Sequence, residues 1–234
     1  MSKCTSQKQF NALAAKYRKT EKLYRWQGPD SIVAELDLLD LETTSPLKVL
    51  LLGAGTGTDA ARVKEKLPQA EIHGCDLSQS MLDIATDCGH IDADKTKVAD
   101  LSQSAPYDNN SFDLVICCGT AEYLGEPKRL INEMARITKP GGHIISTFRK
   151  NTVTNIALHW IGAVQNAISF IPFIDPVGHK TTTTEDELTS IAQNEMENVH
   201  CSAPYTAYYQ NMIPYTPKSG PPVTYITLSA QKPT

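Results

Sequence analysis

The sequence predicts one α/β domain in which a mainly parallel, seven-stranded sheet is covered by helices on both faces, with the last strand antiparallel. Short apolar runs alternate with helix-like segments for roughly a hundred residues, which is typical of βαβ units. A glycine-rich turn follows the first of these runs, and two late runs, 199–209 and 223–230, can form an antiparallel pair at the sheet edge. A chain of 234 residues suits a single domain of this kind.

The first elements are expected to be helices. Residues 10–25 are rich in helix formers and are followed by Gly28-Pro29, so we expect a helix or a broken helix there. Asp30 or Ser31 can cap a second helix, and residues 43–46 are expected to end it.

The middle of the chain carries the alternating strands and helices. The run at 48–52 is apolar and stops at a glycine, as a central parallel strand that is buried on both faces does. Ser78 is a predicted N-cap, and the residues 139–142 (Lys-Pro-Gly-Gly) predict a sharp stop. Strands are expected at 48–52, 71–75, 96–99, 112–117 and 143–148, and helices at 58–67, 78–89 and 127–138.

The end of the chain departs from this alternation. Residues 151–171 predict a strongly apolar helix inserted after the fifth strand, and Thr184 can cap a short helix through Gln193. The apolar insertion can serve as a lid, as a dimer face or as a membrane-surface helix. We prefer the first two, because a membrane-surface helix normally carries lysine and arginine and residues 152–171 contain neither.

Composition excludes several function classes. A net charge of −4 and a pI near 5.9 argue against nucleic acid and against an anionic membrane as partners. The six cysteines include no CxxC pair, so we expect no metal site and no disulfide framework. The polar N-terminus and the absence of an 18-residue apolar run favour a cytoplasmic protein without a membrane span.

The sharpest feature is the turn Gly53-Ala54-Gly55-Thr56-Gly57. Glycine permits positive φ and close approach of a ligand, and the following helix presents free N–H groups at its start. The turn can therefore wrap a polar ligand, although a tight turn without a ligand explains the same residues. The spacing is neither the dinucleotide fingerprint nor a phosphate-binding loop.

An acid closes the second strand, and another closes the third. Asp76 comes 19 residues after Gly57, where a carboxylate can accept hydrogen bonds from both hydroxyls of a ribose; the alternative is a helix N-cap. Asp100 can accept from an adenine amino group while Leu101 covers the ring, or it can be a solvated loop acid. Leu77 and Met81 can pack against the same base or belong to the core.

At this point the sequence resembles the class I S-adenosylmethionine-dependent methyltransferases of the small-molecule type. Any one of the matching segments is moderate evidence of the family, but five in the right order are strong. The segments are VLLLGAGTG (49–57), HGCDLSQSML (73–82), VADL (98–101), SFDLVICCGTAEYL (111–124) and ITKPGGHIISTF (137–148).

The resemblance implies a Rossmann-like three-layer fold, S-adenosyl-L-methionine as cofactor and a role for each motif. The three glycines would face the methionine end of the cofactor, Asp76 the ribose, and Asp100 and Leu101 the adenine, while Cys118 and Gly119 would line the region of the sulfonium. It also implies a division into an N-terminal helical cap (1–46), a cofactor-binding core (47–150), an insertion or lid (151–184), and a helix with an edge hairpin (185–234).

One departure from the family concerns Leu51. The family usually has an acid two residues before the first glycine of the turn, where it helps hold the methionine ammonium. Backbone carbonyls near Cys118 or a side chain from the N-terminal segment would have to replace it. The departure weakens the case for methyl transfer more than the case for cofactor binding.

Residues that would act on the acceptor are less clear, because an activated methyl donor needs mainly alignment. His159, in the apolar insertion, is the weak candidate for a catalytic base, and a structural histidine is the alternative. Tyr123 can close the pocket or pack in the core, and Tyr17 and Trp26 can fold over the sulfonium. Glu122 is expected to be solvated.

The predicted function is methyl transfer to O, N or C of a small molecule, and a homodimer is the assembly that the sequence leaves open. The alternatives are a cyclisation or elimination that uses the same cofactor, a non-catalytic regulatory subunit of the same fold, and an NAD-dependent dehydrogenase. The intact turn, Asp76 and Asp100 argue against the regulatory subunit, and the glycine spacing argues against the dehydrogenase.

Overall fold

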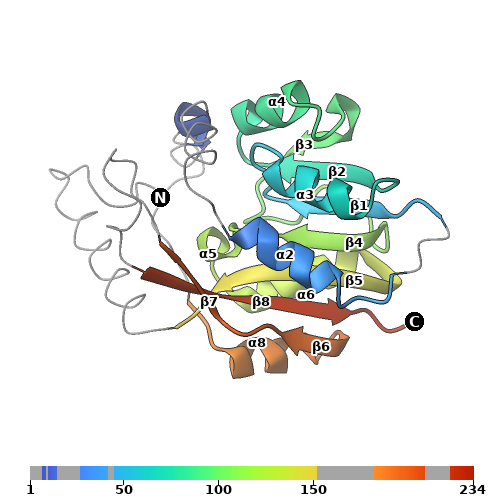
Figure 1. The fold of residues 1–234 in the computed structure, drawn as a ribbon, viewed down its shortest axis with the longest axis vertical. Helices are drawn as coiled ribbons and strands as arrows, with labels where there is room; N and C mark the ends of the chain where they lie inside the picture. The colour runs from blue at the N-terminus through green and yellow to red at the C-terminus, as the bar shows by residue number, and fades with distance from the viewer. Residues whose placement is uncertain (1–6, 9, 15–26, 42–44, 152–181, 209–221) are drawn as a thin grey trace, which may run out of the picture.

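The computed structural model describes residues 7–8, 10–14, 27–41, 45–151, 182–208 and 222–234. Within these residues one twisted sheet crosses the molecule between two layers of helices (Figure 1). The strands are β1 (Lys48–Leu52), β2 (Glu71–Asp76), β3 (Thr96–Val98), β4 (Phe112–Cys117), β5 (Thr138–Arg149), β6 (Glu197–Cys201), β7 (Tyr205–Tyr208) and β8 (Pro222–Gln231).

The order of strands across the sheet is β3-β2-β1-β4-β5-β8-β6, with β7 also paired to β8. The first five of these are parallel to one another, whereas β8 is antiparallel to both β5 and β6. The predicted sheet with its reversed last strand is therefore confirmed. Because β1 and β4 are central, the turns after them meet at the same edge of the sheet, which is where ligands of open α/β sheets bind.

Helices cover both faces of the sheet. α2, α3 and α4 supply buried residues to one apolar cluster, and α6 and α8 supply them to the other. The helices are α2 (Gly28–Leu36), α3 (Thr58–Lys66), α4 (Gln79–Asp87), α5 (Ala121–Leu124), α6 (Pro127–Ile137) and α8 (Glu185–Ala192), with a 3₁₀ turn at Ala93–Lys95. Residues 10–14 are also helical.

The apolar run of β1 follows from these two layers. Leu50 and Leu52 belong to the cluster under α6 and α8, while Val49 and Leu51 belong to the cluster under α2, α3 and α4. Alternate side chains point to opposite faces, so a strand covered on both faces needs apolar residues at every position. Leu51, where the family usually has an acid, is thus a core residue that is 2% exposed.

Two helix and strand starts differ from the sequence-based expectation. α2 begins at Gly28, with Pro29 in its first turn, and not at a cap on Asp30 or Ser31. Asp30 instead pairs with Arg62, and the Ser31 hydroxyl donates to the Gly28 carbonyl. The helix α6 ends at Ile137, as the stop at 139–142 predicts, but β5 begins at Thr138 and not at residue 143, because residues 139–142 form an irregular part of the strand with Gly141 at φ 75°.

The expected strand at 199–209 is interrupted. β6 and β7 pair with successive parts of β8, and residues 202–204, which include Pro204, separate them. Proline has no N–H to donate to a ladder, which accounts for the break. The helices expected at 151–171 and over the later part of 10–25 lie outside the described residues.

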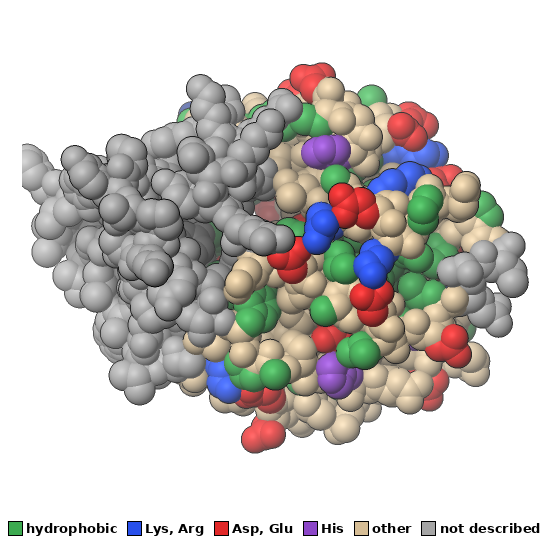
Figure 2. All heavy atoms as spheres, viewed as in Figure 1, with side chains coloured by type: hydrophobic (Ala, Val, Ile, Leu, Met, Phe, Trp, Pro, Cys, Tyr) green, Lys and Arg blue, Asp and Glu red, His purple; other side chains and the backbone are tan. Residues whose placement is uncertain are grey.

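The surface over α2 and α3 carries charges of both signs. Ion pairs join Arg62 to Asp30 and Glu65, and Lys66 to Asp37. Figure 2 shows basic and acidic side chains alternating over this face instead of gathering by sign. In the part of the chain that the structure describes, no helix is both long and apolar enough to cross a membrane.

Candidate functional site

The turn between β1 and α3 is held by backbone hydrogen bonds to the neighbouring strand. The N–H groups of Gly53 and Ala54 both donate to the Cys75 carbonyl, at 2.8 and 2.9 Å. Gly53, Gly55 and Gly57 have φ values of 75°, 51° and 80°, a region that side chains with a Cβ rarely adopt. All three glycines of the motif are therefore required by the backbone conformation.

The three glycines differ in what surrounds them. A Cβ at Gly53 would lie 2.1 Å from Thr120 Oγ1, and a Cβ at Gly57 would lie 2.8 Å from the Cβ of His90. At Gly55 the nearest atom would be the Gly53 carbonyl oxygen, 4.0 Å away. Packing among the described residues thus occupies the space beside Gly53 and Gly57, whereas these residues leave the space beside Gly55 open to a ligand.

Asp76 lies directly against this turn. Its Oδ2 accepts from the N–H of Gly55 at 2.9 Å, and its Oδ1 accepts from the N–H of Ser78 at 2.8 Å. Burial raises the pKa of Asp76, while these N–H groups act in the opposite direction. A carboxylate has about four lone-pair positions, so each oxygen of Asp76 keeps capacity for one further donor.

The N-cap of α4 is Ser78 and not Asp76. The Ser78 hydroxyl oxygen accepts from the N–H of Met81 and donates to Asn11 Oδ1 at 2.6 Å. The alternative role considered for Asp76, capping this helix, is therefore taken by its neighbour. Met81 is 4% exposed and Leu77 is half-buried.

The N-terminal segment covers the ends of two strands. Gln7 Nε2 donates to the Leu77 carbonyl at 2.9 Å, and the ring of Phe10 meets that of Tyr123 edge-on at 5.8 Å. Gln7 thus contacts the segment that follows β2, and Phe10 contacts the segment that follows β4. The sequence predicts a helix that starts at residue 10, but it does not identify Gln7, Phe10 or Asn11 as contact residues, because they belong to no recognisable motif.

The segment after β3 is shaped by local hydrogen bonds. Asp100 Oδ1 accepts from the N–H of Ser102 at 3.0 Å, and Leu101 is partly buried against the core. The guanidinium of Arg129, from α6, donates to the Leu101 carbonyl at 3.3 Å. Leu101 therefore has a fixed backbone position beside the edge where Asp76 lies.

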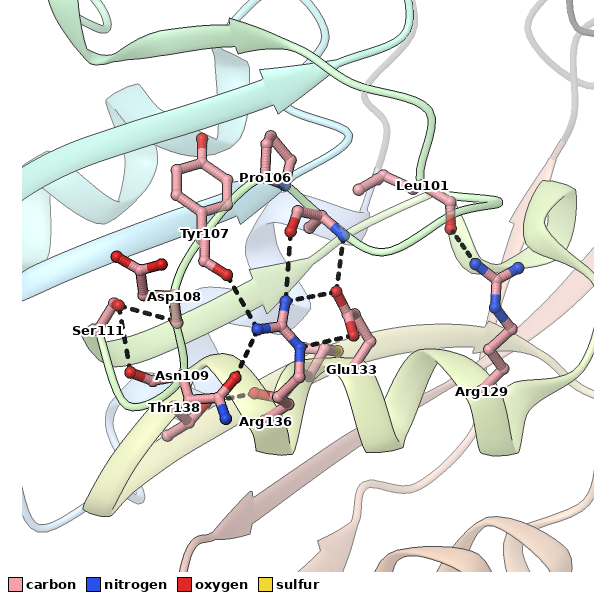
Figure 3. Close-up of polar contacts among 12 residues, drawn as sticks. Leu101, Pro106, Tyr107, Asp108, Asn109, Ser111, Arg129, Glu133, Arg136 and Thr138 are labelled. Carbon is pink, nitrogen blue, oxygen red and sulfur yellow. Dashed lines mark hydrogen bonds and ion pairs between the residues drawn. The ribbon is translucent and has the colours of Figure 1, made fainter.

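Two further side chains of α6 hold the rest of this loop (Figure 3). Arg136 donates to the carbonyls of Ala105 and Tyr107, and Glu133 accepts from the N–H of Ala105 at 2.6 Å. Arg136 and Glu133 are also paired with each other at 2.7 Å, and this hydrogen bond is the main cause of the lowered pKa of Glu133. The loop that begins at Asp100 is therefore anchored to the side chains of α6.

The end of β4 forms the other wall of the site. The N–H of Gly119 donates to Thr147 Oγ1 at 2.8 Å, and Cys118 is 8% exposed. Burial raises the pKa of the Cys118 thiol well above its usual value, and the Asp59 carboxylate raises it further. This thiol is protonated at neutral pH and is not a nucleophile.

Glu122 is not solvated, contrary to the expectation from the sequence. It is 3% exposed, because the short helix α5 packs on β5 and turns it inward, where the Tyr225 hydroxyl of β8 donates to its Oε1 at 3.4 Å. A four-residue helix is too short for its buried face to be recognised by periodicity, which is why sequence reasoning missed it.

Other candidates from the sequence lie elsewhere. His159, Tyr17 and Trp26 fall outside the described residues. Among the residues that the structure describes, no three histidine, cysteine or acidic side chains gather as metal ligands would. The described site therefore consists of a glycine with open space beside it, a half-buried carboxylate with spare acceptor capacity, and two anchored walls, an arrangement that can hold a diol and a flat ring.

Comparison with known proteins identifies a related domain. Residues 50–146 match the family described as "Methyltransferase domain". The chain is 33% identical over 120 residues to malonyl-acyl-carrier protein O-methyltransferase of Hahella chejuensis, covering 50% of this chain and 42% of that protein. It is 28% identical over 132 residues to ubiquinone biosynthesis O-methyltransferase of Neisseria meningitidis, covering 53% of each.

The chain thus spans about half the length of the curated relatives it matches. Among solved structures, magnesium protoporphyrin IX methyltransferase of Synechocystis, with bound SAH, is similar at a TM-score of 0.66 and 18% identity. That similarity covers 99% of this chain and all of the other, so the two chains have similar folds.

Proposed function

We propose that this chain transfers the methyl group of S-adenosyl-L-methionine to O, N or C of a small-molecule acceptor, because residues 50–146 match the family described as "Methyltransferase domain". The relatives named above are methyltransferases, two of them named for acyl-carrier-protein and quinone chemistry. The acidic net charge supports a small molecule over a nucleic acid as the acceptor.

One observation supports cofactor binding above all others: Asp76 and Gly55 meet. The carboxylate bonds the N–H of Gly55 at 2.9 Å and retains acceptor capacity, while the space beside the Gly55 Cα is open. A ribose diol needs two acceptors at one point, and an amino-acid tail needs bare backbone next to it. The residues present therefore fit the cofactor.

We assign the remaining roles by position. Asp100, Leu101, Leu77 and Met81 would hold the adenine, and the turn 53–57 the methionine end. Cys118 and Gly119 would lie near the sulfur. When bound, the cofactor supplies a methyl group on a positively charged sulfur, and the protein's task is to align an acceptor with it and to exclude water.

The lid, the cap and the oligomer remain parts of this proposal. Residues 151–184 would cover an apolar part of the acceptor or form a dimer face, and residues 1–46 would form the cap. In support, Gln7 and Phe10 already contact the segments after β2 and β4. His159 would then approach the acceptor from the lid.

A second candidate is a cyclisation or elimination that uses the same cofactor. It is favoured by Leu51, a buried core residue where the family has an acid that helps hold the ammonium group. Turnover that releases S-adenosylhomocysteine would support methyl transfer and exclude this alternative.

Cofactor binding is tested by thermal unfolding with S-adenosylhomocysteine. A ligand at a hundred times its Kd stabilises the folded state by about 2.7 kcal/mol, which corresponds to a rise in Tm of about 5–10 °C for a chain of this size. Asp76→Ala is expected to abolish the rise, and Asp83→Ala, which removes an exposed acid on α4, is expected to keep it. An unchanged Tm of the unaltered protein in millimolar ligand would contradict the proposal.

A further inference from the structure

A buried carboxylate with an unfilled acceptor position lies beside the end of β4. Glu122 is 3% exposed, and its Oε1 accepts a long hydrogen bond of 3.4 Å from the Tyr225 hydroxyl. Within the described residues its Oε2 has no hydrogen-bond partner. Burial of an ionised carboxylate without partners is costly, so a donor from a bound molecule would complete its coordination.

Polar side chains of β5, β7 and β8 share one face of the sheet with the Tyr225 hydroxyl that contacts Glu122. Arg149 stands opposite Tyr225 in the β5–β8 ladder, so the two side chains share a face. Arg149 is 4% exposed, and its Nε also has no partner within the described residues. Tyr205 stacks on Tyr225 at 5.8 Å. Glu122, Arg149, Tyr205 and Tyr225 therefore form a buried polar cluster with one unfilled acceptor and one unfilled donor.

The polar cluster adjoins the cofactor site. Glu122 follows Gly119 by three residues, and after burial and the Asp59 carboxylate its charge also contributes to the raised pKa of the Cys118 thiol. Glu122 therefore lies near Cys118, the residue assigned to the sulfur end of the cofactor. The cluster occupies the side of β4 that faces β5 and β8, whereas the glycine turn occupies the side that faces β1.

We propose that Glu122 is a catalytic residue that binds the nucleophilic group of the acceptor, and that this group is an amine or a hydroxyl. The inference rests on the proposed function and names the substrate class of the same site. An acceptor N–H or O–H would donate to Glu122 Oε2, and an oxygen elsewhere on the acceptor would accept a hydrogen bond from the Nε–H of Arg149. A carboxylate in this position serves both to orient the nucleophile and to receive its proton.

The step balances without another reactant. The lone pair of the acceptor nitrogen or oxygen forms the bond to the methyl carbon, and the carbon–sulfur bond breaks with its electron pair left on sulfur. The N–H or O–H proton passes to Glu122 Oε2. The products are the methylated acceptor, S-adenosylhomocysteine and a protonated Glu122 that returns its proton to solvent.

The test compares two cofactor analogues by calorimetry and needs no acceptor. S-Adenosylhomocysteine lacks the transferable group, whereas sinefungin carries an ammonium in place of the sulfonium methyl. If Glu122 faces that position, the unaltered protein binds sinefungin about tenfold or more tightly than S-adenosylhomocysteine, as a charged hydrogen bond in a buried site would produce. Glu122→Gln removes this preference and leaves S-adenosylhomocysteine affinity unchanged.

The control and the contrary outcomes separate the two proposals. Glu126→Gln makes the same charge change at an exposed position four residues later and keeps the preference for sinefungin. If Glu122→Gln keeps the preference for sinefungin, the inference is overturned. An equal loss of affinity for both ligands also overturns it, because that result would place Glu122 beside a group that the two ligands share. Failure of the unaltered protein to bind either ligand overturns the proposed function itself.

Discussion

At the scale of single residues, the three glycines of the turn have separate reasons to be glycine. All three have positive φ, but against the described part of the chain only Gly55 has free space where a Cβ would point. A Cβ at Gly53 would clash with Thr120, and a Cβ at Gly57 would clash with His90. Stability and ligand binding can therefore be separated by substitution within one motif.

Gly55→Ala is expected to cost about 1 kcal/mol of stability, since an alanine at φ 51° is strained but meets no atom. Its affinity for S-adenosylhomocysteine should fall at least tenfold. Gly57→Ala should instead cost about 3 kcal/mol or more, because its Cβ would also lie 2.8 Å from the Cβ of His90. Chemical denaturation and calorimetric titration measure both quantities, and equal loss of stability in the two variants would refute the distinction.

Individual residues could be predicted where a motif carries them. Asp76 was identified by its place after the second strand, and the structure puts it within hydrogen-bond distance of the turn. Glu122 was misjudged as solvated and Gln7 was missed. Their positions depend on the turn of α5 and on the docking of the N-terminal segment, which are tertiary features without a local periodicity.

At the scale of elements, α6 fixes the loop after β3. Its residues Arg129, Glu133 and Arg136 bond four backbone groups of the loop between Leu101 and Tyr107. A helix on one face of the sheet thereby sets the position of the segment that we assign to the adenine. The Arg136–Glu133 ion pair holds two of these side chains in place, so the stability of the loop depends on that pair.

Arg136→Ala is expected to lower the free energy of unfolding by about 2 kcal/mol at pH 7, because it removes hydrogen bonds from a charged donor. Arg129→Ala, which loses one long bond at 3.3 Å, should cost less. The pKa of Glu133 is lowered in the folded state, chiefly by Arg136. The contribution of ionised Glu133 to the free energy of unfolding is therefore present above the unfolded carboxyl pKa of about 4.3. It is lost as the pH falls through the lower pKa of the folded state.

Denaturation curves of both variants and of the unaltered protein at pH 7 and near pH 3 measure this difference. The gap between Arg136→Ala and the unaltered protein should narrow at the lower pH. A gap of the same size at both values would show that the Arg136–Glu133 pair does not supply the stability.

Elements could be predicted where local signals agree. The apolar run of β1 and the Ser78 cap of α4 were confirmed by the structure. The stop expected for the preceding helix was confirmed, since α6 ends at Ile137. The strand start expected at residue 143 was wrong, because residues 139–142 belong to β5, where Gly141 makes an irregularity and donates its N–H to the Lys232 carbonyl. A turn signature in a sequence cannot reveal that a distant segment, here the end of β8, will pair with it.

At the scale of the whole molecule, the sheet order brings the ends of β1, β2 and β4 to one edge. The strand β8 lies between β5 and β6 and is antiparallel to both. The glycine turn, Asp76 and Cys118 are then neighbours at the carboxyl edge, while the opposite edge carries structural contacts such as the Lys139–Asp113 ion pair.

This polarity predicts where a ligand slows hydrogen exchange. S-Adenosylhomocysteine should protect the locally exchanging amides of residues 53–57, 76–78 and 99–102, and leave those of residues 108–111 unchanged. Mass-spectrometric exchange with and without ligand measures this directly. Protection confined to the opposite edge would contradict the placement of the site.

The most direct test of the central claim is a crystal structure of the protein with S-adenosylhomocysteine. We expect both ribose hydroxyls to donate to the Asp76 carboxylate and the amino-acid tail to pass over the backbone of Gly55. A ligand bound elsewhere, or a ribose that does not touch Asp76, would contradict the claim that this carboxylate and this turn form the cofactor site.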